Sequence, residues 1–285
     1  MNNKFGVDSF IWTENFSSQD LWIIEKAKNL GFQVIDFAIS NPFTFPTEVV
    51  KAELERVGID CVCTTTLTLE TNPISPDPQI RKQAVTAMKK AVDICNSLQS
   101  PILGGVNYAA WGYLTKQPRT QQEWQWAVEC MQEAADYAKE TGTVKICVEC
   151  INRFETHFLN IAEDAVAFCK DVGTDNMMVH LDCFHMNMEE SNFTAAVEVC
   201  GKEYLGYVHV NENNRGIPGT GLVPFQEFFT ALKNIGYDGP LVIESFDPNF
   251  KELAGNCAIW RKLADTGEEL AVKGLANLLA IAGTI

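Results

Sequence analysis

Eight short apolar runs divide this chain at nearly regular intervals, and amphipathic stretches separate them. The runs are rich in Val, Ile, Phe and Cys and are bounded by Gly, Pro, Asp or Asn, as is typical of buried β-strands. They lie near residues 4–8, 33–39, 60–66, 101–106, 144–150, 177–182, 205–210 and 240–246. Strand–helix alternation implies parallel strand pairing, and eight such units can close a sheet. The sequence therefore predicts an α/β protein that folds as a single (β/α)8 barrel, or TIM barrel.

The amphipathic stretches carry the end signals of helices. Asp77, directly before a proline, is a candidate N-cap, and helices are expected to stop at Gly31, Gly142 and Gly236. The length of 285 residues is near that of one eightfold barrel, and no linker or low-complexity tract interrupts it. We therefore expect one domain over residues 1–285, with a C-terminal helical extension from about residue 254.

Charge and cysteine content exclude several classes of protein. The formal net charge is −15 and the pI is about 4.7, which argues against nucleic acid and anionic membrane surfaces as partners. The first residues, MNNKFGVDSF, lack the pattern of a secretory signal, and no apolar run approaches the length of a membrane span. Ten cysteines in such a chain indicate free thiols in a reducing compartment. We expect a cytoplasmic protein.

Four of the predicted strands end in residues that bind metals. Glu149, Asp182, His209 and Glu244 stand at or near the ends of four consecutive runs, each about one strand-plus-helix unit from the next. The C-terminal ends of barrel strands surround one mouth, where active sites lie. A carboxylate in an apolar strand is costly unless it is paired or metal-bound. Three carboxylates with one imidazole favour one divalent cation per chain, Mn²⁺ first and Co²⁺ or Mg²⁺ as alternatives, over a thiolate zinc site.

The loops after these strands add polar groups that can contact a ligand. Glu155 follows the strand of Glu149, His185 follows that of Asp182, and Arg215 lies in a loop rich in Gly and Pro. Such loops commonly shape binding sites. His180, two residues before Asp182, is expected to be a core histidine beneath the site.

The residues around these positions resemble the ketose 3-epimerases, the D-tagatose and D-allulose (psicose) 3-epimerases among the xylose isomerase-like barrels. The resemblance covers essentially the whole chain, and the strings NRFETH and DCFHMN are its most specific parts. It implies that Glu149, Asp182, His209 and Glu244 bind the metal and that Glu155, His185 and Arg215 contact the substrate. It also implies a homodimer or homotetramer, and the aromatic residues of segment 108–126 are expected to be exposed at such a contact. Asp8 departs from the family, which has an aromatic residue on the first strand, so the identity of the sugar stays open.

Epimerisation at C3 of a ketose needs two carboxylates, because a proton leaves one face of the carbon and returns to the other. Glu149 and Glu244, on the fifth and eighth strands, are our candidates for this catalytic pair. The predicted function is metal-dependent C3 epimerisation of a free ketose, of the D-allulose/D-fructose, D-tagatose/D-sorbose or L-ribulose type, through a metal-stabilised enediolate.

Other functions remain open at this stage. The same groups suit an aldose–ketose isomerase, including one for an inosose or hydroxypyruvate. Dehydration of a keto-sugar, a metal-dependent nuclease and a non-catalytic sugar- or metal-binding protein are further alternatives. The four histidines and the acidic charge argue against the nuclease.

Overall fold

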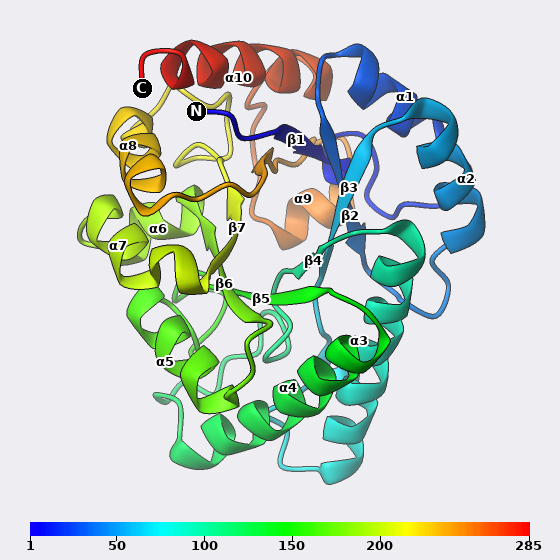
Figure 1. The fold of residues 1–285 in the computed structure, drawn as a ribbon, viewed down its shortest axis with the longest axis vertical. Coiled ribbons are helices and arrows are strands. Elements are labelled where there is room, and N and C mark those ends of the chain that lie inside the picture. Colours follow the sequence, from blue (N-terminus) through cyan, green and yellow to red (C-terminus); the bar gives the residue numbers. More distant parts are fainter.

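The chain forms a closed barrel of eight parallel strands inside a ring of helices (Figure 1). The structure is a computed structural model that describes residues 1–285. Each strand pairs in parallel with the next one in sequence, and β8 closes the barrel by pairing with β1. The strands are β1 (Phe5–Asp8), β2 (Val34–Ile39), β3 (Asp60–Thr65), β4 (Ile102–Gly104), β5 (Lys145–Glu149), β6 (Met177–Asp182), β7 (Leu205–His209) and β8 (Leu241–Ile243). The predicted (β/α)8 barrel and its eight strands are confirmed.

Helices follow the strands and cover the outside of the barrel. The α-helices are α1 (Trp22–Asn29), α2 (Thr47–Val57), α3 (Pro78–Leu98), α4 (Gln121–Thr141), α5 (Ala162–Val172), α6 (Cys183–Glu189), α7 (Phe193–Tyr204), α8 (Phe225–Ile235), α9 (Lys251–Asn256) and α10 (Gly267–Ala282). Two 3-10 helices, η1 (Ser9–Ile11) and η2 (Leu69–Thr71), follow β1 and β3. None of these helices is both long enough and apolar enough to cross a bilayer.

The helix ends follow their local sequence. The Asp77 side chain accepts the Gln79 backbone N–H at the start of α3, and Pro78 takes the first helical position, as predicted. Thr120 and Glu123 form a reciprocal capping box at the start of α4. Gly236 ends α8 with a φ of 73°, a left-handed conformation that favours glycine.

The inside of the barrel is layered, and the layers set the height of the site. Seven buried residues, one from each strand after β1, fill the lower interior: Val34, Val62, Ile102, Cys147, Met178, Tyr207 and Val242. Side chains two residues farther along a strand point to the same face. The next inward layer is mostly polar and consists of Asp8, Asp36, Thr64, Gly104, Glu149, His180, His209 and Glu244. The polar layer therefore lies directly above an apolar floor.

The C-terminal helix α10 packs against α8, β8 and η1, between α8 and α1 (Figure 1). The N-terminal amine of Met1 also reaches the carbonyl of Ala282 at 3.5 Å. The expectation of exposed aromatics in segment 108–126 is wrong. Tyr108 is fully buried, and Trp111 and Trp124 are half-buried with their indole N–H groups hydrogen-bonded to Glu155 and Asp171.

Candidate active site

The four predicted metal ligands meet at the C-terminal end of the barrel. Glu149, Asp182 and His209 are the last residues of β5, β6 and β7, and Glu244 directly follows β8. One donor atom from each of the four lies within 4.8 Å of the others. Because the strand ends come together only when the barrel closes, residues far apart in sequence form one compact cluster.

The surroundings of His209 fit a cation at the centre of this cluster. Its Nε2 lies 3.2 Å from the Asp36 carboxylate, whereas its buried Nδ1 has no hydrogen-bond partner. Nδ1 instead faces Glu244 Oε2 at 3.4 Å and Asp182 Oδ2 at 3.5 Å. A bare nitrogen lone pair would be repelled by two carboxylates, so this point requires either a proton or a metal ion. Three carboxylates and one imidazole suit a divalent cation with oxygen preference.

The three carboxylates of the cluster differ in their partners. The Glu149 carboxylate accepts no hydrogen bond, and burial, Glu244 and Asp182 raise its pKa well above the ordinary value. Asp182 Oδ2 accepts hydrogen bonds from Asn211 at 2.6 Å and Arg215 at 3.0 Å. Burial alone would raise the pKa of Asp182 and of Glu244, but Arg215 and His209 lower both. Glu149 therefore favours the protonated form, whereas Asp182 and Glu244 favour the ionised form.

Arg215 supplies the positive charge of the site. Its Nη1 donates to Glu244 at 2.6 Å and to Asp182, and its guanidinium lies between the rings of Phe184 and Phe246. The backbone of Arg215 has a φ of 61°, which is unusual for a residue other than glycine. The Ser245 hydroxyl donates to the Arg215 carbonyl at 2.6 Å and helps to hold this conformation. Strained backbone of this kind concentrates at functional sites.

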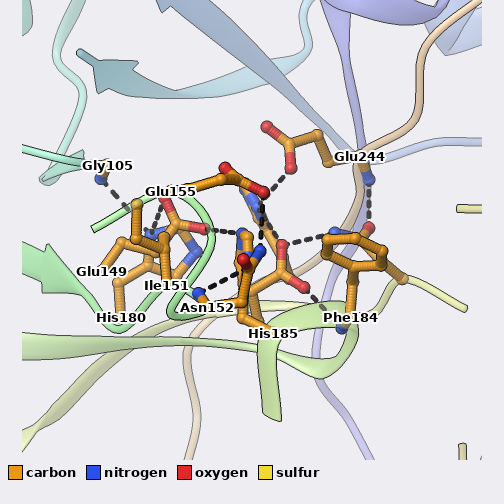
Figure 2. Close-up of polar contacts among 12 residues, drawn as sticks. Gly105, Glu149, Ile151, Asn152, Glu155, His180, Phe184, His185 and Glu244 are labelled. Atoms are coloured by element: carbon orange, nitrogen blue, oxygen red, sulfur yellow. Dashed lines mark hydrogen bonds and ion pairs between the residues drawn. The ribbon is translucent and has the colours of Figure 1, made fainter. Parts of the chain in front are cut away.

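Glu155 and His185, the other two predicted substrate contacts, share Asn152 as a partner (Figure 2). The Asn152 backbone N–H donates to His185 Nδ1 at 3.1 Å, which places the proton of the neutral ring on Nε2, and Nε2 lies 3.3 Å from Arg215 Nη2. Burial lowers the pKa of His185 and favours that neutral form. Glu155 accepts hydrogen bonds from the Asn152 side chain at 2.6 Å and from the Trp111 indole at 2.8 Å.

A pocket of about 160 Å³ opens onto these groups. Five polar or charged residues proposed from the sequence line it: Glu149, Glu155, His185, Arg215 and Glu244. Its other walls are mostly apolar, with Phe10 and Trp111 among them, and α9 contributes Leu253 and Asn256. Aromatic walls with polar groups gathered at one end suit a small polar ligand that has a carbon backbone.

His180 is buried inside the barrel, as expected, but it lies level with Glu149, its register partner on β5, and not beneath the site. It is fully buried, and its Nδ1 accepts the Gly105 backbone N–H at 3.3 Å (Figure 2). His180 could also be grouped with Glu149 and His209 as a metal-binding set. The hydrogen bond from Gly105 occupies the nitrogen nearest Glu149, and burial lowers the pKa of the ring. We therefore favour the four-residue set that contains Asp182 and Glu244.

Several residues of the site were not predicted from the sequence. Asp36 contacts His209, Asn211 bonds Asp182, and Asn152 and Ser245 fix the loop residues described above. The sequence could have identified Asp36 as a candidate, because its carboxylate stands within the apolar run VIDFAI. Asn211 follows His209 by two residues and so continues the inward face of β7. Asn152 and Ser245 lie in irregular segments, where sequence periodicity carries no information.

Comparison with known proteins assigns the fold to a family. Residues 24–278 match the family described as xylose isomerase-like TIM barrel. The chain belongs to that family. A ketose 3-epimerase from Arthrobacter globiformis is 33% identical, with 94% of this chain and 92% of the relative covered. A D-psicose 3-epimerase from Ruminiclostridium cellulolyticum is 34% identical, with 93% and 92% covered.

Solved structures agree with this assignment. The crystal structure of a Methylomonas sp. D-allulose 3-epimerase in complex with D-allulose superimposes with a TM-score of 0.92 at 32% identity, with 98% of this chain and 96% of that chain covered. Within the xylose isomerase-like barrels, the chain therefore groups with the ketose 3-epimerases. It is an isomerase, and the resemblance expected from the sequence is confirmed.

Proposed function

We propose that this protein catalyses the metal-dependent C3 epimerisation of a free ketose. The observation that carries the proposal is the pair Glu149 and Glu244, which line one pocket from β5 and from the end of β8. Both carboxylates also belong to the four-residue cluster whose donor atoms lie within 4.8 Å of one another. Two carboxylates that face one pocket from different strands can act on one substrate carbon as base and acid.

In this mechanism one glutamate removes the C3 proton and the other returns a proton to the opposite face. The C3–H bond breaks, its electrons form an enediolate with the C2 carbonyl, and a new C3–H bond then forms with inverted configuration. A divalent cation bound by Glu149, Asp182, His209 and Glu244, Mn²⁺ first and Co²⁺ or Mg²⁺ as alternatives, would act as a Lewis acid on the sugar oxygens. Asp182 and His209 serve only to hold that ion.

The remaining polar residues orient the sugar. The Nε2–H of His185 donates to an oxygen at the carbonyl end of the substrate, and Arg215 supplies positive charge there. Glu155 is held by Trp111 and Asn152 and accepts a hydrogen bond from a sugar hydroxyl. These groups fix the reacting carbon between the two glutamates.

A free sugar suits the pocket better than a sugar phosphate. Arg215 is the one cationic side chain in the pocket lining, and Asp182 and Glu244 already pair with it. Apart from the proposed metal ion, no further cationic group lines the pocket to bind a phosphate dianion. The D-allulose/D-fructose, D-tagatose/D-sorbose and L-ribulose types are the candidate substrates.

The test is proton exchange in D₂O. The protein is stripped of metal, supplied with Mn²⁺ and incubated with D-fructose, D-allulose, D-tagatose and L-ribulose, and each reaction is followed by NMR. We expect deuterium at C3 together with the C3 epimer. Deuterium at C1 or C2 with formation of an aldose would instead establish an aldose–ketose isomerase, and no exchange with any of the sugars would contradict the proposal.

A further inference from the structure

The contact between His209 and Asp36 joins opposite parts of the barrel interior. Asp36 lies on β2 and His209 lies on β7, 173 positions later in the chain, and both side chains are fully buried. These strands are not neighbours in the sheet, so side chains alone make the connection. A buried carboxylate is costly unless its oxygens receive hydrogen bonds.

Asp36 is fully engaged by donors. Its Oδ2 accepts the Tyr207 hydroxyl at 2.5 Å and lies 3.2 Å from His209 Nε2, and its Oδ1 accepts the Thr64 hydroxyl at 3.2 Å. Because a carboxylate accepts hydrogen bonds, the His209 hydrogen sits on Nε2. The lone pair of Nδ1 is then directed at the space shared with Asp182 and Glu244. Tyr207 also packs edge-on against the His209 ring, with the centroids 4.9 Å apart.

We propose that Asp36 is a positioning residue that orients His209 for the metal ion, with Tyr207 as its buried support. This inference rests on the proposed metal-dependent function. Histidines that bind metals commonly donate their other ring N–H to a carboxylate, which fixes both the tautomer and the ring orientation. Asp36 touches neither the pocket nor the four proposed ligands other than His209, so its effect on catalysis passes through that ring.

The test measures Mn²⁺ affinity directly, by the loss of the free-ion EPR signal as protein is added. We expect Asp36→Ala to weaken binding by about 10–100-fold, the usual effect of losing such a partner. Asp36→Asn keeps the size of the side chain and guards against misfolding of the alanine variant. It should also bind more weakly than the wild type, because an amide can present either its oxygen or its NH₂ to the ring.

Thr64→Val is the matched control. It removes a donor from the other oxygen of the same carboxylate and leaves the His209 contact in place, so Mn²⁺ affinity should change less than about threefold. The thermal midpoint of each metal-free variant is measured in parallel, because a purely structural role would lower that midpoint without changing affinity.

The outcomes separate the two proposals. Wild-type Mn²⁺ affinity in both Asp36 variants would overturn the positioning role while leaving the metal-dependent function intact. Failure of the wild-type protein to bind Mn²⁺, Co²⁺ or Mg²⁺ would overturn the proposed function itself, and the positioning role with it. At saturating Mn²⁺ the Asp36 variants should recover most of their kcat, because the glutamates that move the proton are unchanged.

Discussion

Glu149 and Glu244 lie in one pocket but have different partners. Arg215 donates to Glu244 at 2.6 Å, whereas the Glu149 carboxylate accepts no hydrogen bond and lies 3.8 Å from one ring nitrogen each of His180 and His185. In the metal-free site, this asymmetry allows one carboxyl to hold a proton while the other is ionised. Because neither residue can replace the other, a single substitution can test the role of each.

Glu149→Gln and Glu244→Gln should each lower turnover by at least about 10²–10⁴-fold, because an amide cannot accept the C3 proton. Sugar binding should remain measurable by calorimetry at saturating Mn²⁺, since the amide keeps the shape of the side chain. Near-normal turnover in either variant would refute the assignment of that residue.

The control for this pair is the same substitution at Glu155, the third glutamate of the pocket. Trp111 and Asn152 already occupy its oxygens, and we assign it to binding alone. Glu155→Gln should therefore raise KM more than it lowers kcat.

At the level of the elements, the close packing of β3, β4 and β5 at the height of the site depends on Gly105. This residue directly follows β4, and its N–H donates to His180 while its carbonyl accepts the Glu149 N–H at 3.1 Å. Its φ is 98°, and a Cβ built on it would lie 2.3 Å from the Thr65 carbonyl oxygen. Both the left-handed backbone and the lack of room for a Cβ beside Thr65 thus require glycine.

Gly105→Ala should lower the thermal midpoint much more than Gly112→Ala. The two glycines have φ values of 98° and 74°, but a Cβ on Gly112 would meet nothing within 4 Å. Gly112→Ala should therefore lower the free energy of unfolding only by the strain of a left-handed backbone, about 1–2 kcal/mol. Gly105→Ala adds overpacking against a backbone, about 1–3 kcal/mol more. Circular dichroism melts of both variants measure the difference, and equal midpoints would show that the strands can separate at this point without cost.

The elements also show where the sequence is informative. The ends of β5, β6 and β7 were predictable because inward residues alternate along a strand and barrel strands end at similar heights. Glu149, Asp182 and His209 follow from that rule. The segments η1 and α9 were not predicted, because their conformation depends on packing around Phe246 and not on a local period. The partner of Asp36 could not be read from the sequence, because closure of the barrel creates the contact.

At the scale of the whole molecule, the acidic groups of the site oppose the stability of the barrel when no cation is bound. Burial, Glu244 and Asp182 raise the pKa of Glu149, so ionising it in the folded chain is unfavourable. Burial would lower the pKa of His209, but Glu244, Asp182 and Asp36 raise it well above 6.5. Metal-free protein therefore retains protons at both residues that a bound cation would displace.

These shifts predict how the stability of the metal-free protein depends on pH. The pKa of Glu149 is higher in the folded protein than its ordinary value of 4.5, so its carboxyl ionises less readily in the fold than in the unfolded chain. Its contribution to the free energy of unfolding therefore falls as pH rises above 4.5. The contribution of His209 is fully present below 6.5 and is lost as pH rises through its folded pKa. Both residues make the metal-free barrel less stable toward alkaline pH.

Added Mn²⁺ should therefore raise the thermal midpoint more at about pH 8 than at about pH 6, because the ion replaces protons that are held more weakly at the higher pH. At a concentration of 100 times Kd the ion contributes about 2.7 kcal/mol. Differential scanning fluorimetry with EDTA or with Mn²⁺ between about pH 6 and pH 8 measures this rise in thermal midpoint. In Glu149→Gln the rise should depend less on pH. If Mn²⁺ raised the thermal midpoint equally at every pH, its binding would displace no protons. The ion would then not bind at the cluster of Glu149 and His209.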